Sequence, residues 1–155
     1  MIVRNLYVLL WATIIMLTSL NSCSKSTPID DDGLSTAVCG KAILLGDSAY
    51  ANATIDATTD IVSVEYKNSC ITLELQYGGG CEDHEIDLVA RTSAALGPAD
   101  TDVFDVIVSH DNTDPCEALI SDTRVFDLSR MITDAGGQQI MLLIDGWDES
   151  ILIQS

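Results

Sequence analysis

Hydrophobic and polar residues alternate with a period of two along much of the chain after about residue 39, and no long stretch has the 3.6-residue period of a helix. The clearest example is a pair of segments, 61–66 and 71–77, separated by the turn-like Lys67-Asn68-Ser69. In the second segment every odd-numbered residue is apolar and the even-numbered residues are polar. This pattern predicts two strands, each with one buried face and one solvated face.

Similar segments recur at short intervals, with turn residues such as Asp145-Gly146 between them. No alternation of strands with long helices is visible, and one helical turn is expected around residues 115–120. The pattern predicts an all-β fold of about seven strands, an antiparallel β-sandwich that can take an Ig-like form. A small β-barrel is the alternative. The further predicted strands cover residues 84–90, 103–110, 124–128, 139–144 and 150–154.

The N-terminus has a different pattern, with Arg4 followed by an uninterrupted apolar run over residues 6–17. This run is shorter than the roughly 20 apolar residues of a membrane span and is typical of a secretory leader. The following Leu20-Asn21-Ser22-Cys23 resembles the lipobox of bacterial lipoproteins, although Asn21 departs from the commoner small residue. The resemblance implies cleavage before Cys23 and fatty acyl chains, such as palmitate, on that cysteine. An uncleaved signal anchor, or an ordinary leader with an incidental Cys23, are the alternatives.

The expected organisation is therefore a signal peptide over 1–22, a lipidated cysteine with a flexible acidic tether over 23–37, and a β domain over 38–155. All 24 acidic residues but only six of the seven Lys and Arg follow Cys23, so the mature chain carries a net charge near −18. Charge of this sign repels phosphate backbones, which excludes nucleic acid as a partner. The expected partners are a membrane, through the lipid, and a protein or glycan ligand.

Assigning Cys23 to lipid leaves four cysteines, and export makes disulfides the expected state. The two histidines each lie near a cysteine, in Cys81-x2-His84 and His110-x5-Cys116. Both histidines are in phase with the apolar side chains of their strands, so the two rings are expected to point inward and to meet.

Two interpretations of this quartet stay open, of which a Cys81–Cys116 disulfide beside two buried histidines is preferred. The alternative is a tetrahedral zinc site made by Cys81, His84, His110 and Cys116. Either interpretation leaves Cys39 to pair with Cys70. A catalytic Cys–His dyad is a third reading, but no recognisable nucleophile motif accompanies it.

Two further features carry weaker signals. The run Gly78-Gly79-Gly80 lacks the Lys-Ser/Thr of a phosphate-binding loop, and we expect these glycines to permit positive φ and close packing beside the disulfide. The acidic loops 111–114 and 145–149 contain oxygen ligands suited to calcium, but neither matches an EF-hand. Trp147 is a candidate for stacking on a sugar or for capping the end of the sandwich.

The stretch from Tyr77 to Leu88, followed by His110, Asp114-Pro115-Cys116 and residues 126–129, resembles a pattern of small bacterial lipoproteins of unassigned function. The resemblance covers roughly residues 60–130 and implies that the Cys/His quartet acts as one unit. The sequence thus predicts a lipid-anchored lipoprotein of the bacterial outer membrane, periplasmic or surface-exposed, that acts as a non-enzymatic binding or structural module without a cofactor. A small zinc-dependent or thiol enzyme built on the quartet is the alternative.

Overall fold

The structure is a computed structural model, and it describes residues 39–154. In this part of the chain, nine strands and two short helices follow one another. Their bounds are β1 Lys41–Ala42, β2 Leu44–Leu45, α2 Asp47–Asn52, β3 Asp60–Lys67, β4 Cys70–Gly79, β5 Ile86–Thr92, β6 Thr101–His110, β7 Ala118–Asp127, α3 Ser129–Asp134, β8 Gln139–Ile144 and β9 Ile151–Ile153.

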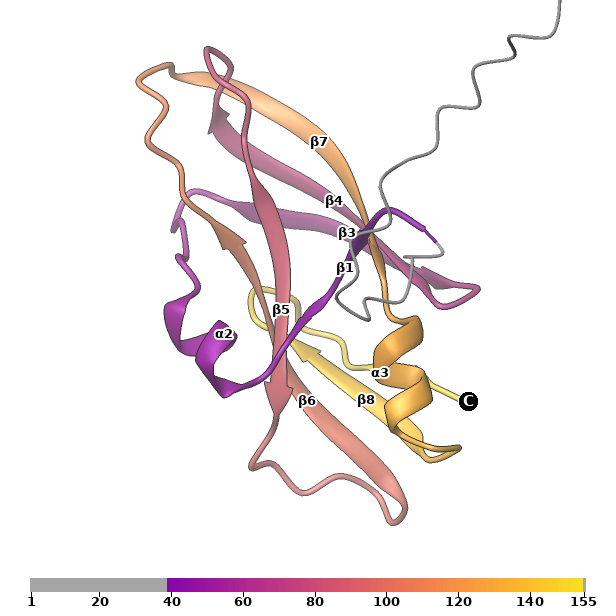
Figure 1. Ribbon diagram of the computed structural model, residues 1–155. Helices are drawn as coiled ribbons and strands as arrows, with labels where there is room; N and C mark the ends of the chain where they lie inside the picture. The colour runs from indigo at the N-terminus through magenta and orange to yellow at the C-terminus, as the bar shows by residue number, and fades with distance from the viewer. Residues whose placement is uncertain (1–38, 155) are drawn as a thin grey trace, which may run out of the picture. The chain divides into compact units, whose positions relative to one another are not determined.

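The strands form two sheets that pack face to face as a β-sandwich (Figure 1). One sheet has the order β1-β7-β4-β3 and the other has the order β2-β5-β6-β8-β9. The two sheets do not close into a barrel within the described residues, so the prediction of a sandwich is confirmed and the barrel alternative is wrong.

The β3–β4 hairpin forms where the alternating pattern predicted it. Tyr66 pairs with Ile71, and the turn between the strands uses Asn68 at φ 52° and Ser69 at φ 65°. Two successive residues with positive φ give the backbone twist that a tight hairpin needs. Along β4 the alternate residues Ile71, Leu73 and Leu75 are fully buried, as the period of two requires.

The sandwich departs in two respects from the expected antiparallel arrangement of about seven strands. Both sheets are mixed, because β1 runs parallel to β7, β2 to β5 and β6 to β8. The two additional strands, β1 and β2, are each two residues long, too short to show alternation. They form one crossing segment: Ile43 lies buried between them, where the chain passes from one sheet to the other (Figure 1).

The helical turn predicted at residues 115–120 is also absent. Residues 118–120 instead begin β7 and pair with Tyr77–Gly79 of β4. The side chain of Leu119 is 72% exposed, so this half of β7 shows little of the alternation that identifies a strand. The two helices lie elsewhere: α2 comes directly after β2, and α3 follows β7.

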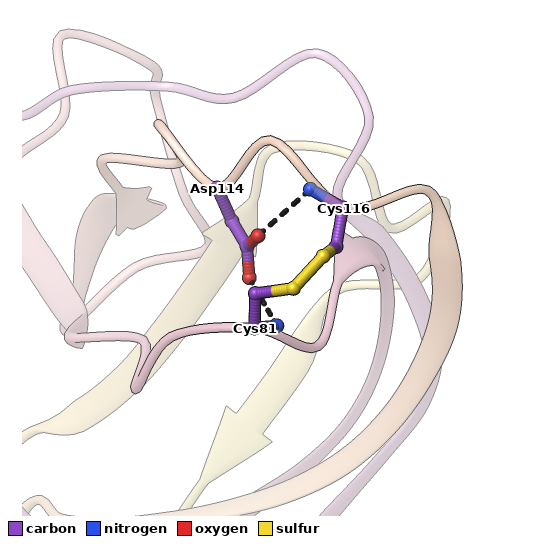
Figure 2. A group of neighbouring side chains, drawn as sticks. All are labelled: Cys81, Asp114 and Cys116. Carbon is purple, nitrogen blue, oxygen red and sulfur yellow. Dashed lines mark hydrogen bonds between the residues drawn. A yellow bond between two sulfur atoms is a disulfide. The ribbon is translucent and has the colours of Figure 1, made fainter.

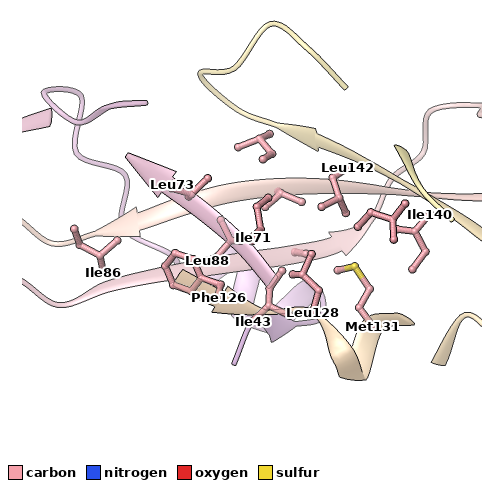
Figure 3. Packing of buried hydrophobic residues seen from close by; sticks show 14 of the residues in the cluster. Ile43, Ile71, Leu73, Ile86, Leu88, Phe126, Leu128, Met131, Ile140 and Leu142 are labelled. Atoms are coloured by element: carbon pink, nitrogen blue, oxygen red, sulfur yellow. The ribbon is translucent and has the colours of Figure 1, made fainter. Parts of the chain in front are cut away.

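The core fills the space between the sheets with aliphatic and aromatic side chains contributed by both (Figure 3). Phe126 and Leu73 come from one sheet, and Leu88 and Leu142 from the other; all four are at most 1% exposed. Burial of each such side chain contributes about 1.5–3 kcal/mol. This core and both disulfides lie within residues 39–154, so the segment has what an independently folding domain needs.

His110 is a fully buried polar residue at the end of β6, among the apolar side chains of the core. Within residues 39–154, none of the helices has the length and apolar character required to span a membrane.

Candidate functional site

Two disulfides join parts of the domain that are distant in sequence. Cys81 after β4 is bonded to Cys116 before β7, and Cys39 before β1 is bonded to Cys70 at the start of β4. These are the pairs preferred from the sequence. The loops they close span 35 and 31 residues, so each bond fixes a long-range contact. Disulfides of this kind are the mark of an extracytoplasmic protein.

The two histidines meet inside the sandwich, as predicted, although His84 precedes β5 and only His110 lies in a strand. Nδ1 of His84 lies 2.9 Å from Nε2 of His110, and the two rings are edge to face. The ring of Tyr77 packs against both, with centroid distances of 4.8 Å and 4.7 Å. The three rings therefore form one buried aromatic cluster at the end of the sandwich that the Cys81–Cys116 bond closes.

The carboxylate of Asp114 holds the two disulfide-linked loops together (Figure 2). Its Oδ2 accepts hydrogen bonds from the backbone N–H groups of Gly80, Cys81 and Glu82 at 2.8–3.0 Å, and its Oδ1 accepts one from Cys116 at 2.9 Å. The side chain of Asp114 is only 1% exposed. A carboxylate that accepts several backbone N–H bonds is strongly favoured in its charged form.

Asp114 is therefore a fixed negative charge in the cluster. The backbone hydrogen bond from Cys116, which is the largest contribution, outweighs the effect of burial and, with those from Cys81, Glu82 and Gly80, holds the pKa of Asp114 far below its usual range. Its Oδ2 lies 3.3 Å from Nε2 of His84, an ion-pair distance without the geometry of a regular hydrogen bond. An imidazolium at His84 would thus face a permanent anion.

On the other side of the histidine pair, Thr59 connects His110 to a second carboxylate. Oγ1 of Thr59 lies 2.8 Å from Nδ1 of His110 and 3.1 Å from Oδ2 of Asp56. Partial burial acts to raise the pKa of Asp56, but hydrogen bonds donated by Thr58, Asn112 and Thr59 outweigh it and lower the pKa to about 2. A continuous polar chain therefore runs from Asp56 through Thr59 and both histidines to Asp114.

The directions of donation along this chain are consistent with no added proton or with one added proton on the histidine pair. With both rings neutral, Thr59 donates to His110, His110 donates to His84, and Nε2–H of His84 faces Asp114. With one added proton, His84 carries N–H on both nitrogens, facing Asp114 with Nε2 and donating to His110 with Nδ1, while Nδ1–H of His110 donates to Thr59 and Thr59 donates to Asp56. A second proton would bring two N–H groups together at 2.9 Å, so the pair holds at most one.

The surroundings of His110 also disfavour its protonation, in agreement with the limit of one added proton on the pair. Burial, followed by the neighbouring His84, lowers the pKa of His110 below its ordinary value, and Asp56 opposes the shift only in part. His110 is therefore neutral in the folded protein at neutral pH.

The same geometry limits what chemistry the cysteines can perform. Among residues 39–154, one group of metal-type side chains lies together: Cys81, Asp114 and Cys116, with ligand atoms within 4.8 Å of one another. Their two sulfurs are bonded to each other, and a disulfide has no thiolate to bind zinc or to attack a substrate. The zinc and thiol interpretations therefore require this bond to be reduced.

Two of the oxygen ligands proposed for calcium in the loop 111–114, those of Asn112 and Asp114, are occupied by bonds within the protein. Oδ1 of Asn112 accepts a bond from the backbone of Asp114, and its amide donates to Asp56 and to the carbonyl of Gly78. Trp147, in the other acidic loop, is half-buried and packs against the core. This fits capping of the sandwich better than stacking on a sugar.

Two of the three glycines in the run have the local role expected for them, whereas Gly78 has neither a positive φ nor a close neighbour. Gly79 and Gly80 have φ values of 153° and 111°, which side chains rarely permit. A Cβ atom on Gly79 would lie 2.5 Å from Nε2 of His84. Gly79 therefore makes room for the buried histidine.

Sequence reasoning missed Asp56 and Thr59 altogether and did not single out the role of Asp114. With 24 acidic residues in the chain, no carboxylate stands out by its presence. The one signal available was the Asp-Pro-Cys order at residues 114–116, which places a capping carboxylate two residues before a disulfide cysteine.

Comparison with known proteins shows that the fold is similar to that of a solved structure. No family model matches the chain, and no curated protein is similar to it. Among solved structures, a NigD-like immunity protein from Bacteroides caccae aligns with a TM-score of 0.52 and 16% identity, over 79% of this chain and 62% of its own. A Bacteroides vulgatus protein of unknown function, DUF1344, aligns with a TM-score of 0.48 and 12% identity, over 75% of this chain.

The chain thus spans 62% and 56% of the lengths of these two proteins. At such low identity, the first likeness supports a shared β fold and nothing about activity.

Proposed function

We propose that this protein is an exported lipoprotein, held at the bacterial outer membrane through lipid on Cys23, whose β-sandwich is a non-enzymatic binding module for a protein or glycan. One observation carries the non-enzymatic part. The groups that could perform chemistry in the Cys/His cluster are joined to one another, the sulfurs as the Cys81–Cys116 disulfide and the histidines as a hydrogen-bonded pair.

The burial of the cluster supports the same conclusion. His110 is 0% exposed, and the side chains of His84 and Asp114 are 8% and 1% exposed. A catalytic acid, base or nucleophile must reach a substrate atom at hydrogen-bond distance, directly or through one water. These groups instead reach one another, and their effect is to hold two loops in a fixed shape. Preorganised loops are what a binding surface requires, because they lose little entropy on association.

An envelope location is supported by the disulfides and by the likeness to a Bacteroides protein described as an immunity protein. Such a description fits a protein that binds more readily than one that catalyses. The proposed anchor, Cys23, lies outside the described residues and rests on the lipobox resemblance and the acidic segment after it.

The anchor is tested by feeding cells labelled palmitate and comparing the natural protein with Cys23→Ala. We expect the label and the membrane association to disappear in Cys23→Ala and to persist in Ser26→Ala, a matched change outside the lipobox. Label that persists in Cys23→Ala, or a Cys23→Ala protein that stays in the membrane fraction like the natural one, would show that Cys23 is not the anchor.

The binding role is tested with the immobilised domain, residues 35–155, exposed to protein and glycan fractions of the cell envelope. We expect saturable retention of one component by the oxidised domain and much weaker retention by the domain after reduction of its disulfides. Retention of no component, or equal retention by a denatured control, would contradict a binding module.

A further inference from the structure

A cavity of about 390 Å³ opens at the end of the sandwich where β5 ends and β6 begins. It lies on the opposite end of β5 from the Cys81–Cys116 loops. Its volume is within the range of about 300–1,000 Å³ found for small-molecule sites. The cavity continues the apolar core outward, because its lining includes core side chains and side chains that pack against them. These are Leu45, Ala90, Phe104, Met131 and Ala135.

Asp102 places a carboxylate among the apolar residues that line the cavity. Along β6, Asp102 has the same strand phase as Phe104 and Val106, which face the core, so its side chain starts from the core-facing side of the sheet. With its amide oriented to donate, Gln138 lies 3.2 Å from Oδ2 of Asp102. This partner is neutral and leaves the negative charge of Asp102 uncompensated.

Two more carboxylates, those of Asp47 and Asp134, lie at the same cavity. Within residues 39–154, neither Asp47 nor Asp102 forms an ion pair. Asp134 has an ion pair with Arg130 at 3.8 Å, in which both side chains are about two-thirds exposed and solvent screens the interaction.

Arg91 is the one basic residue among those that line the cavity, and its charge is directed elsewhere. It pairs across the sheet with Asp105, whereas the next pair, Ala90 and Val106, faces the core. Arg91 and Asp105 therefore lie on the outer face of the sheet. There, the guanidinium group contacts Asp105 at 3.4 Å and lies 4.1 Å from the ring centroid of Tyr50.

We propose that this cavity binds a small amphipathic cation, with its apolar body against Phe104 and Met131 and its ammonium or guanidinium group beside Asp47, Asp102 and Asp134. The apolar lining favours a hydrocarbon body by removing its surface from water. The three carboxylates, with the arginine turned away, favour a positive head and repel an anion of the same shape. The inference goes beyond the proposed function, because the cavity belongs to the domain and needs no lipid anchor.

The test uses three probes that separate charge from apolar surface: n-octylammonium, n-octanoate and methylammonium. The oxidised domain, residues 35–155, is titrated with each probe while backbone amide resonances are followed by NMR. We expect n-octylammonium to give saturable shifts at Ala90, Phe104, Met131 and Ala135 at millimolar concentration. The other two probes are expected to give none at these residues.

Substitution then tests the role of the carboxylates. The double variant Asp47→Asn/Asp102→Asn is expected to weaken octylammonium binding about tenfold, because it removes two of the charges beside the head group. The matched change Asp83→Asn, in the loop at the other end of β5, is expected to leave the affinity unchanged. Amide spectra of the free variants establish that both keep the natural fold.

Three results would overturn the proposal: no saturable shift with n-octylammonium, equal binding of n-octanoate, or unchanged affinity in the folded double variant. None of them bears on Cys23 or on retention of an envelope component, so failure here is distinguishable from failure of the proposed function.

Discussion

Nδ1 of His84 and Nε2 of His110 lie 2.9 Å apart, and the pair stands between the carboxylates of Asp114 and Asp56. His110 is fully buried at the edge of the apolar core. One nitrogen must donate and the other must accept. The folded protein therefore cannot carry a proton on all four ring nitrogens, whereas the unfolded chain protonates His110 near its usual pKa of about 6.5.

This difference predicts that the domain loses stability when mildly acidified. Because burial and His84 lower the pKa of His110, the unfolded chain binds more protons than the folded protein below about pH 6.5. The stability that neutral His110 contributes is fully present above that pH and declines as the pH falls toward the lowered pKa. Urea unfolding at pH 7.5, 6.5 and 5.5 should show a decrease of at most about 1.4 kcal/mol per pH unit.

The variant His110→Gln serves as the control for this pH dependence. It removes the titrating group, so we expect lower stability at pH 7.5 and a shallower dependence between pH 7.5 and 5.5. If the natural protein is equally stable across this range, or if His110→Gln keeps the full slope, the buried histidine is not the cause.

Two adjacent glycines offer a matched test of the packing around His84. Gly79→Ala places a Cβ 2.5 Å from Nε2 of His84 at a φ of 153°, whereas a Cβ on Gly78 meets no atom within 4 Å. We expect Gly79→Ala to lower the unfolding free energy by about 2 kcal/mol or more through strain and overpacking. Gly78→Ala should change it by less than about 1 kcal/mol. If urea unfolding gives similar free energies of unfolding for the two variants, the close contact between Gly79 and His84 does not constrain the residue type at this position of β4.

The two disulfides should contribute similar stability but have different local effects. Their loops of 35 and 31 residues predict a loss of about 3–4 kcal/mol for replacing either pair by serine, through the gain in entropy of the unfolded chain. Cys81→Ser/Cys116→Ser should also shift the imidazole NMR signals of His84, because it loosens the loops that position Asp114. Cys39→Ser/Cys70→Ser should leave those signals in place. Unchanged imidazole signals in Cys81→Ser/Cys116→Ser would mean that the disulfide is not needed to position Asp114 beside His84.

The sequence predicted those parts of the fold that depend on neighbouring residues. Alternation identified the long strands, and strand phase brought His84 and His110 together. The parallel pairing of β6 with β8 joins residues more than 30 positions apart, and nothing in a single sequence records it. For the same reason, Asp56 and Thr59 were not predicted beside His110: their position depends on how a loop packs against the end of another strand.

The strand β7 shows a second limit. Its first two residues, Ala118 and Leu119, are exposed although both are apolar, so the start of the strand lacks the alternation of apolar and polar residues that marks one. Pro115 and the residues after it therefore predicted the start of a helix. Pairing with Tyr77–Gly79 of β4 overrides that local tendency, since extended pairing satisfies the backbone groups of both strands.

The Cys/His cluster is thus a closed structural unit of the domain, with a buried histidine pair beside a disulfide, and not a chemical centre. The most direct measurement is a count of free thiols, made under denaturing conditions, together with elemental analysis of the domain, residues 35–155, produced by export without a reducing agent. We expect no free thiol and no bound zinc. Two titratable thiols at Cys81 and Cys116 with one equivalent of zinc would contradict this expectation and would favour a metal site at the same residues.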